Sequence, residues 1–568
     1  MSTTNSWAIE PTSATLRRPV ALATAEEGKW LLVGNRDAGS VSILETQSRK
    51  ILAESTLAKR LTDMIALDKG SRLLVLDETE NEVRLWLRKE TAWTGGARMK
   101  VSPTPIKLCV STDETQAFVA SLWTRQLTCL RLSSAVDTSG ELQISAVIDL
   151  PFAPREMFYL EDKQLLIVAE AFGGRLALVD TEKQKLTGVR HLPGHNIRGL
   201  ARSPSGKKLL ISHQIMSNLA ETTHNDIHWG VLMTNLVRWL DLEKLLQNQP
   251  DLLSSSHVQL LGDAGNAAGD PGPLVMSADG RTIVALSGVG EVAIGEETAY
   301  TFQRLPVGDR PVALLAEGNS VYVANMFSDS ISLVDLTSRT PPIPIPLGKM
   351  REMNAVERGE TLFFDARVAM EGWFSCHSCH SDGHTNGQLN DNFSDDSFGA
   401  PKRVLTLLGV GQSAPWAWNG GKKKLEQQIE HSIRSTMQGN EPRRQVVADL
   451  AAYLRTLPPP PSRDELLGVA NREAIARGRL VFEAQQCQSC HRPPFYTSEA
   501  TYDVGLKDEK NRTEFNPPSL LGVGQRGPYL HDNRAETLED LFLRLQHPHG
   551  KPLPADSRSD LLHFLRSL

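Results

Sequence analysis

The chain of 568 residues exceeds what one hydrophobic core usually supports, so at least two domains are expected. Its formal net charge of −6 and its 23% of charged residues predict neither a nucleic-acid-binding surface nor a polybasic membrane patch. No apolar run approaches the roughly 20 residues of a transmembrane helix. Residues 1–10 have neither the basic nor the apolar segment that is typical of a signal peptide.

A strand–turn–strand pattern recurs along residues 1–340. Each copy has a short apolar strand, a turn rich in Gly, Asn, Asp or Ser, and a second alternating strand. The copies begin at Leu31, Leu73, Ala117, Leu165, Leu209, Thr282 and Val321. Most of them are spaced by about 40–48 residues, the length of a four-stranded blade. We therefore predict an all-β, seven-bladed propeller over residues 1–340. The sequence Val321-Tyr-Val-Ala-Asn325 resembles the repeat of the propeller family that is named after the tetrapeptide Tyr-Val-Thr-Asn.

The interval between the fifth and sixth copies is longer than the others. It contains His213, His224, His228, Trp229 and Trp239. One interpretation is a loop that reaches the C-terminal region, where it lines a substrate path or supplies a ligand. The other is a long blade loop with polar histidines.

Two cysteines, Cys109 and Cys129, belong to the third copy. In an oxidising compartment they would form a disulfide. Otherwise they are two small buried side chains. The sequence leaves both interpretations open.

Two C-x-x-C-H motifs organise the rest of the chain. They are Cys376-His-Ser-Cys379-His380 and Cys487-Gln-Ser-Cys490-His491. This spacing lets two thiols add to the vinyl groups of one porphyrin while the adjoining histidine binds the iron. A Cys₄ zinc site usually separates its two pairs by about 15–20 residues, whereas residues 380–486 separate these pairs. We predict two covalently bound haems c, with His380 and His491 as proximal iron ligands. Haem of this type is attached outside the cytoplasm, so a periplasmic or otherwise extracytoplasmic location is expected.

The haem-binding part is a duplication. Segments 358–364, 407–412 and 449–457 recur as 477–482, 520–525 and 560–568, and the middle pair is identical letter for letter. We predict a mostly α-helical tandem of two cytochrome c-type haem domains, over residues 357–457 and 466–568. Proline-rich linkers are predicted at residues 341–356 and 458–465.

Several segments of this part match a known family. They are 358–367 before the first motif, 418–421 with 425–428, and 528–532 with 537–540. In these segments, residues 350–568 resemble the bacterial di-haem cytochrome c peroxidases and the related MauG enzymes. The resemblance implies that the first haem reacts with hydrogen peroxide and the second receives electrons from a small redox protein, a c-type cytochrome or a cupredoxin. It also implies that Trp418 relays electrons between the haems and that Gln428 lies in the distal pocket of the first.

The first haem pocket departs from the family pattern at its catalytic acid. Gln438 stands where the family has a glutamate, and an amide binds peroxide but does not shuttle a proton as a carboxylate does. Glu430 and Glu441 lie nearby in the sequence as substitutes. Met437 is interpreted either as a distal ligand that closes the first iron or as a core side chain.

The second haem and the metal between the haems depart from the pattern as well. No methionine follows Met437, so the family's distal methionine is absent, and His547 or His549 is predicted to take its place. Imidazole in place of a thioether lowers the reduction potential. His531 is expected near a propionate rather than on iron. Arg403 occupies the position of an asparagine ligand of the family's calcium; it cannot coordinate a cation, which puts this metal in doubt. Its guanidinium would supply the positive charge instead.

Together these observations predict an exported di-haem oxidoreductase with peroxidase-like activity. Trp418, Gln428 and Gln438 are the candidate catalytic residues. One alternative is a MauG-like oxidant of a protein substrate that docks on the propeller. Another is a non-catalytic electron-transfer protein in which both irons are six-coordinate.

Overall fold

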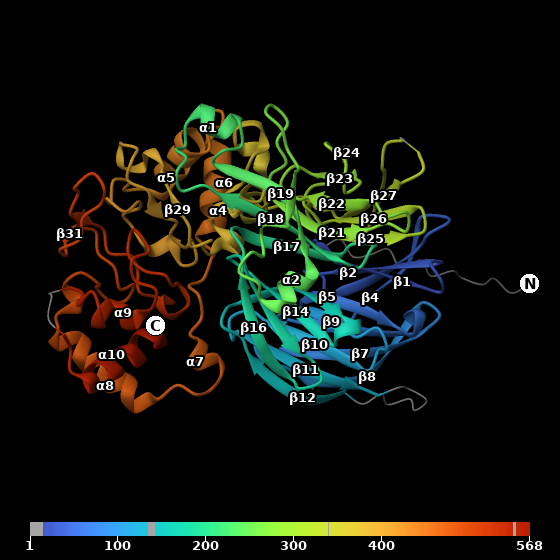
Figure 1. The fold of residues 1–568 in the computed structure, drawn as a ribbon, viewed down its shortest axis with the longest axis horizontal. Helices are drawn as coiled ribbons and strands as arrows, with labels where there is room; N and C mark the ends of the chain where they lie inside the picture. The colour runs from blue at the N-terminus through green and yellow to red at the C-terminus, as the bar shows by residue number, and fades with distance from the viewer. Residues whose placement is uncertain (1–14, 134–141, 339, 549–551) are drawn as a thin grey trace, which may run out of the picture.

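The computed structural model describes residues 15–133, 142–338, 340–548 and 552–568. A ring of sheets forms the N-terminal part, and a region of short helices lies against one side of the ring (Figure 1). Among the described residues, no helix is both long and apolar enough to cross a bilayer.

Seven four-stranded antiparallel sheets form the ring, and in each the strands follow chain order. The first three blades contain β1 (Pro19–Ala25), β2 (Trp30–Asn35), β3 (Ser40–Glu45), β4 (Lys50–Thr56), β5 (Leu61–Leu67), β6 (Arg72–Asp77), β7 (Glu82–Lys89), β8 (Ala92–Lys100), β9 (Pro105–Val110), β10 (Gln116–Ser121), β11 (Gln126–Leu132) and β12 (Leu142–Asp149). The next two contain β13 (Pro154–Leu160), β14 (Leu165–Glu170), β15 (Arg175–Asp180), β16 (Lys185–His191), β17 (His195–Arg202), β18 (Lys208–Met216), β19 (Met233–Asp241) and β20 (His257–Leu260). The last two contain β21 (Pro271–Met276), β22 (Thr282–Leu286), β23 (Glu291–Gly295), β24 (Gln303–Pro306), β25 (Pro311–Glu317), β26 (Ser320–Asn325), β27 (Ser330–Asp335) and β28 (Ile343–Pro346). The predicted seven-bladed propeller is thereby confirmed.

The ring closes between the first and last blades without a shared sheet. The carboxylate of Asp329 accepts hydrogen bonds from the backbone N–H groups of Arg17 and Arg18, at 2.9 and 2.8 Å. Side chains of the two blades, among them Leu31 and Ile331, pack into one apolar cluster. Because a buried N–H group is costly to leave unpaired, the Asp329 carboxylate fixes the segment directly before β1 to the last blade.

The proline run at residues 341–346, predicted to be part of a linker, instead contributes the outermost strand of the last blade. In β28, Ile343 and Ile345 pair with Leu333 and Ile331 of β27. The intervening prolines are tolerated because an edge strand does not need every N–H group for a ladder. The second predicted linker likewise contains the start of a helix, α7 (Arg463–Leu466).

Cys109 and Cys129 are both free thiols. They lie on β9 and β11, the two neighbours of β10, and both are in register with Phe118. Two strand spacings of about 4.8 Å therefore separate them, which is too far for a disulfide. The interpretation as two small packed side chains holds, with Cys129 buried and Cys109 half-buried.

The C-terminal region contains short helices that are joined by long irregular segments, so its helical content is modest but consistent with the predicted fold class. Its helices are α3 (Ala355–Phe363), α4 (Cys376–Cys379), α5 (Leu425–His431), a π-helix (Ser432–Thr436), α6 (Arg444–Leu454), α7, α8 (Arg472–Ala484), α9 (Leu538–Leu543) and α10 (Ala555–Ser567), with the two-stranded ladders β29 (Leu389–Asn390) with β30 (Lys402–Arg403) and β31 (Tyr502–Asp503) with β32 (Glu514–Phe515).

The duplication is visible in how the helices cross. In the first half (residues 357–457), α3 crosses α6 where a Cβ atom on Gly359 would lie 2.0 Å from the carbonyl oxygen of Asp449. In the second half (residues 466–568), α8 crosses α10 where a Cβ atom on Gly478 would lie 2.0 Å from the carbonyl oxygen of Asp560. At each crossing the preceding arginine binds the same aspartate through two hydrogen bonds, at 2.8 and 2.9 Å in the first half and at 2.8 Å twice in the second.

The Arg358–Asp449 pair gives a prediction about pH. The hydrogen bond from Arg358 lowers the pKa of the buried Asp449 carboxyl, against the opposing effect of burial. Because the pKa is lower in the folded chain, the stabilisation is present above the unfolded pKa of about 4 and is lost as the pH falls through the folded pKa. Asp449→Asn is expected to lower the free energy of unfolding by about 1–2 kcal/mol at neutral pH, since Arg358 is partly exposed. In urea unfolding, this difference from the parent protein should shrink on acidification; a difference independent of pH would contradict it.

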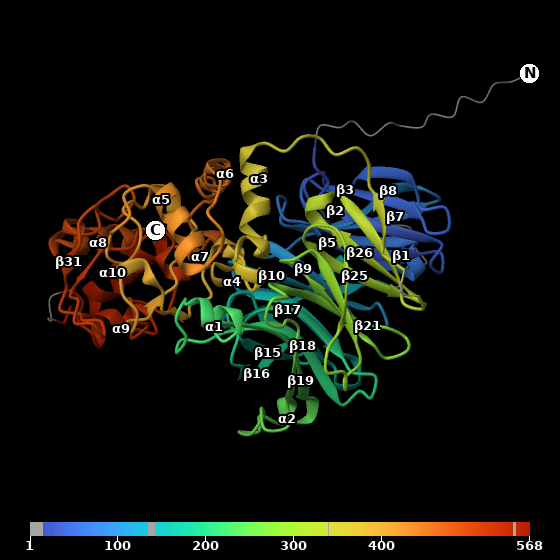
Figure 2. The ribbon, with the colours of Figure 1, turned by 90° about the horizontal axis from the view of Figure 1, so that it is seen from above.

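The long interval between the fifth and sixth copies forms the extended β18–β19 hairpin and its connecting helix, α1 (His224–His228). It projects from the propeller onto the first half of the C-terminal region, which also lies against the propeller through α3 and α4 (Figure 2). The Thr222 N–H group donates to the carbonyl oxygen of Asp391, and His228 Nδ1 lies 2.8 Å from Glu371 Oε1. The loop therefore reaches the C-terminal region, as the first interpretation held. His213 and Trp239, in contrast, are buried in the blade itself.

Candidate functional site

The first C-x-x-C-H motif lines an apolar cavity inside the first half, called here the first cavity. Cys376, Cys379 and His380 form part of its wall, and Phe363, Leu425, Ile433, Leu450 and Leu454 contribute apolar side chains. His380 Nδ1 lies 2.8 Å from the carbonyl oxygen of Leu405. Burial lowers the pKa of His380 to about 4, so the ring is neutral.

The second motif lines an equivalent cavity inside the second half, called here the second cavity. Cys487, Cys490 and His491 lie in its wall, together with Phe482, Leu538, Leu541, Phe542, Leu561 and Leu565. His491 Nδ1 lies 3.1 Å from the carbonyl oxygen of Tyr496, and burial lowers the pKa of His491 to about 4. The two halves thus repeat the chemistry of the site as well as the helix crossing.

The residues of both cavities fit a covalently bound haem. Each cavity has two free thiols at the required spacing and a neutral histidine. In each histidine Nδ1 donates to a carbonyl, so Nε2 is the unprotonated nitrogen that can bind iron. An apolar wall suits the porphyrin face. His380 and His491 would be the proximal ligands, as the sequence predicts.

Trp418 lies between the two cavities and lines both of them. Its Nε1–H group donates to the carbonyl oxygen of Arg403 at 2.9 Å. On the side of the second cavity, its ring lies 6.2 Å from His531 and 6.5 Å from Phe515, and these two rings stack at 4.3 Å. An aromatic group therefore occupies the partition between the two sites.

The three residues predicted for the distal side of the first haem do not all lie at the first cavity. Gln428 and Met437 both line the cavity, and the Oε1 atom of Gln428 is buried without a hydrogen-bond partner. Gln438 is not among the lining residues; its amide group donates to the carbonyl oxygens of Thr222 and Ser435, at 3.0 and 2.8 Å. The interaction with Thr222 turns Gln438 toward the β18–β19 hairpin, which the linear spacing did not indicate.

His547 and His531 both line the second cavity, and no methionine is among the described residues that line it. The Nε2 atom of His531 is buried and lacks a hydrogen-bond partner. His549, the other candidate distal ligand, lies outside the described residues. His547 thus remains a candidate ligand on the same cavity as His491.

Comparisons with known proteins find similarity in the C-terminal region. Residues 353–457 match the family model described as di-haem cytochrome c peroxidase. The C-terminal region is called here the di-haem domain, after its similarity to this family.

Two relatives illustrate the similarity of this di-haem domain. The methylamine utilization protein MauG of Methylorubrum extorquens is 26% identical over 251 residues, which is 35% of this chain and 71% of that protein. The cytochrome c551 peroxidase of Nitrosomonas europaea is 22% identical, over 41% of this chain and 85% of that protein. A solved chain of hydrazine synthase from Kuenenia stuttgartiensis aligns with 58% of this chain and 98% of its own length, at 17% identity and a TM-score of 0.48, which is too low to support an argument about function.

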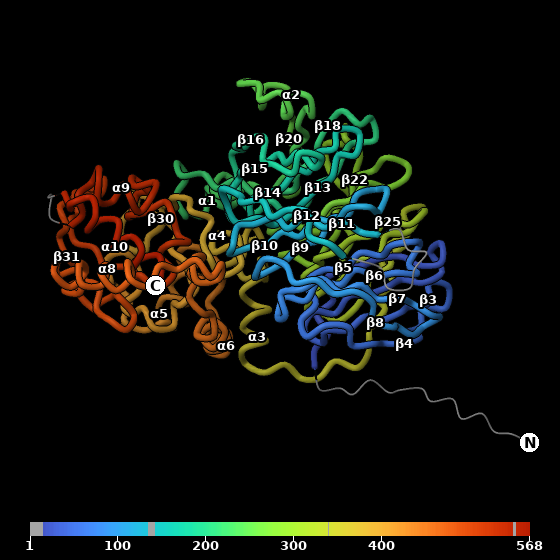
Figure 3. Tube along the Cα trace, turned by 90° about the horizontal axis from the view of Figure 1, so that it is seen from below, coloured from blue at the N-terminus to red at the C-terminus, as the bar shows by residue number. Residues whose placement is uncertain are grey.

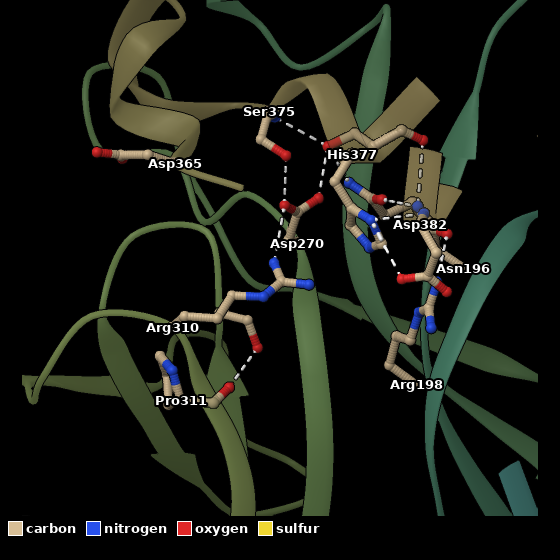
Figure 4. A network of polar contacts seen from close by, with 12 residues as sticks. Asn196, Arg198, Asp270, Arg310, Pro311, Asp365, Ser375, His377 and Asp382 are labelled. Atoms are coloured by element: carbon tan, nitrogen blue, oxygen red, sulfur yellow. Dashed lines mark hydrogen bonds and ion pairs between the residues drawn. The ribbon is translucent and has the colours of Figure 1, made fainter. Parts of the chain in front are cut away.

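Residues of the propeller hold the first C-x-x-C-H motif through a network of polar contacts (Figure 4). The carboxylate of Asp270, between β20 and β21, accepts hydrogen bonds from the hydroxyls of Ser375 and Ser378 at 2.6 and 2.5 Å. Asn196 and His195 donate to the carbonyl oxygen of Ser378, at 3.1 and 2.9 Å. The helix that carries Cys376 and Cys379 is therefore fixed by the propeller as well as by its own half. Sequence reasoning missed these residues, because nothing in a blade strand marks which end faces the other domain.

Two more residues of the di-haem domain were missed. Asp395 is the one carboxylate among the described residues that line the first cavity, and it pairs with Lys402 and Arg512. Arg526 lines both cavities. A signal for Arg526 was present: it follows the repeated segment 520–525, whereas Ser413 follows the identical segment 407–412.

Proposed function

We propose that this chain is an exported di-haem c-type oxidoreductase that reduces hydrogen peroxide at the first cavity. Electrons would enter the second cavity from a small redox protein, a c-type cytochrome or a cupredoxin. The observation that carries the proposal is the position of Trp418, which lines both cavities. A periplasmic location follows from the covalent attachment of haem, and the family of the C-terminal domain supports the reaction class.

When bound, the haems supply iron centres that exchange single electrons and that bind a small oxidant at an open position. The residues of the chain prepare the site for this chemistry. Burial keeps His380 and His491 neutral, and the carbonyl groups of Leu405 and Tyr496 orient their rings. Gln428 offers a buried amide oxygen without a partner, which would accept a hydrogen bond from peroxide.

Proton transfer needs a group that Gln438 cannot provide. Asp395 lines the first cavity and is a carboxylate, the kind of group that moves protons in such sites. Its carboxylate lies 3.5 Å from Lys402 Nζ and also pairs with Arg512. We assign to Asp395 the role that the family gives to a glutamate.

Steady-state kinetics of the holoprotein test the proposal. With a reduced c-type cytochrome as donor, addition of hydrogen peroxide is expected to oxidise the donor with a stoichiometry of two electrons per peroxide. Gln428→Leu keeps the volume of the side chain and removes its amide, so kcat/KM for peroxide should fall by about tenfold or more, equivalent to about 1.4 kcal/mol. If the parent protein does not oxidise the donor when peroxide is added, the proposed activity is contradicted.

A second candidate function, a non-catalytic electron carrier, is favoured by one observation. Met437 is buried in the wall of the first cavity, where its thioether would close the iron to peroxide.

The MauG-like alternative needs a protein substrate on the propeller. The propeller face that carries Asp270 and Arg310 is occupied by the di-haem domain, so such a substrate would have to contact other surfaces.

A further inference from the structure

Two arginines, Arg403 and Arg526, lie where the first and second cavities meet. Both side chains line both cavities. Both residues are buried, with 6% and 8% of their surface exposed. They come from different halves, Arg403 from β30 and Arg526 from the segment after the repeated residues 520–525.

Neither guanidinium has an anionic partner in the described part of the chain. Arg403 Nη2 donates to the carbonyl oxygen of Arg526, and Arg526 Nη2 donates to that of Leu521. The Nε–H group of each arginine is buried without any partner. Other buried arginines differ in one respect or the other: Arg18 pairs with Glu360, whereas Arg190 and Arg238 have no anionic partner among the described residues but donate their Nε–H groups to Leu245 and His213.

Such a pair is unfavourable in the chain alone. Taking a cation out of water costs several kcal/mol unless an opposite charge compensates, and here two cations also repel each other. Burial lowers the pKa of both arginines to about 10, and the charge of Arg403 contributes to the lowering at Arg526. The arrangement is therefore built for anions that the chain itself does not supply.

Anions that compensate these charges must lie in the cavities and must match the planar, forked geometry of a guanidinium. They must also be present on both sides of the partition, because Arg403 and Arg526 line both cavities. A carboxylate matches this fork through two parallel hydrogen bonds. Each haem carries two propionate carboxylates at one edge of the ring, and no other component of the proposed site is anionic and reaches both cavities.

We propose that Arg403 and Arg526 bind propionate carboxylates of the two haems at the junction of the cavities and thereby set the reduction potentials of both. The inference rests on the proposed haem cofactors. Arg403 has a further connection, because its backbone carbonyl accepts the indole N–H of Trp418. One residue would then fix the haem edges and the aromatic group between them, and no divalent cation would be needed there.

Redox titration of the purified holoprotein, followed by visible absorption, tests the inference. Arg403→Gln and Arg526→Gln each remove a positive charge beside the haems, which disfavours the reduced state. We expect both midpoint potentials to become more negative, by up to a tenfold change in the reduction equilibrium, which is about 59 mV for one electron. Arg455→Gln is the matched control, since Arg455 is half-exposed, pairs with Glu426 and lines neither cavity. Chelation of divalent cations is expected to leave the potentials of the parent protein unchanged.

Haem content, measured as the pyridine haemochrome with the mass of the intact chain, separates the possible failures. A parent protein without two covalent haems would overturn the proposed function and this inference together. Glutamine variants that keep both haems and both potentials would overturn this inference alone. If a glutamine variant does not retain haem, the corresponding lysine variant is titrated instead. Lysine keeps the charge without the fork, so a smaller shift in the same direction is expected, and unchanged potentials would again contradict the inference.

Discussion

Gly359→Ala is expected to destabilise the first half of the di-haem domain by about 3 kcal/mol, since an added methyl group there overfills a packed crossing. The Cβ atom would lie 2.0 Å from the Asp449 carbonyl oxygen and 2.8 Å from the Tyr453 Cβ atom. Neither neighbour is the end of a flexible side chain, so α3 and α6 must move apart. Denaturant unfolding of the holoprotein measures the loss.

A matched glycine in the same domain provides the control. At Gly524 the nearest atom to an added Cβ would be the Arg566 Cα atom at 3.4 Å, an ordinary contact. Gly524→Ala should change the free energy of unfolding by less than about 0.5 kcal/mol. Gly478→Ala repeats the first experiment in the second half and should give a similar loss. Equal stabilities of the Gly359 and Gly524 variants would show that the helices do not cross as closely as described.

Trp418→Leu is expected to slow electron transfer between the two haems by about tenfold or more, equivalent to about 1.4 kcal/mol of activation free energy. The substitution removes the aromatic ring from the partition between the cavities and the hydrogen bond to Arg403. Stopped-flow absorption measures the rate: the protein is reduced by one electron at the second haem and mixed with peroxide. The free energy of unfolding is measured in parallel.

Trp416 provides a closely matched control, because it lines the first cavity but not the second. Its indole donates to the carbonyl oxygen of Val410 at 3.3 Å, so Trp416→Leu also loses an indole and a hydrogen bond. This variant should keep the rate of transfer between the haems. An equal loss of rate in both variants would mean that Trp418 acts through packing and not as a relay.

The architecture of this protein was largely predictable from repetition. Blade hairpins carry apolar strands around polar turns, and β2 and β6, for example, are buried along their whole length. The halves of the di-haem domain each repeat the glycine, the arginine and the aspartate, because each helix crossing needs all three. The strand β28 was not predictable, since alternating prolines indicate a linker unless the neighbouring strand β27 is known.

Some residues of the candidate site could likewise be predicted from the sequence, and others could not. His380 and His491 could be predicted from local spacing, because each directly follows the second cysteine of its motif. Trp418 and Gln428 followed from the resemblance, and both line the first cavity. Contacts between distant segments could not be predicted. The hydrogen bonds from Gln438 to Thr222 and from Ser375 to Asp270 both join the di-haem domain to the propeller. The two halves of the di-haem domain lie together at one side of the ring (Figure 3).

The central claim is that the first haem offers an open position and the second does not. An electron paramagnetic resonance spectrum of the fully oxidised holoprotein tests it most directly. We predict a high-spin signal from the first haem beside a low-spin signal from the second, whose ligands would be His491 and a second histidine. Two low-spin signals and no high-spin signal would contradict the claim and assign Met437 to the first iron.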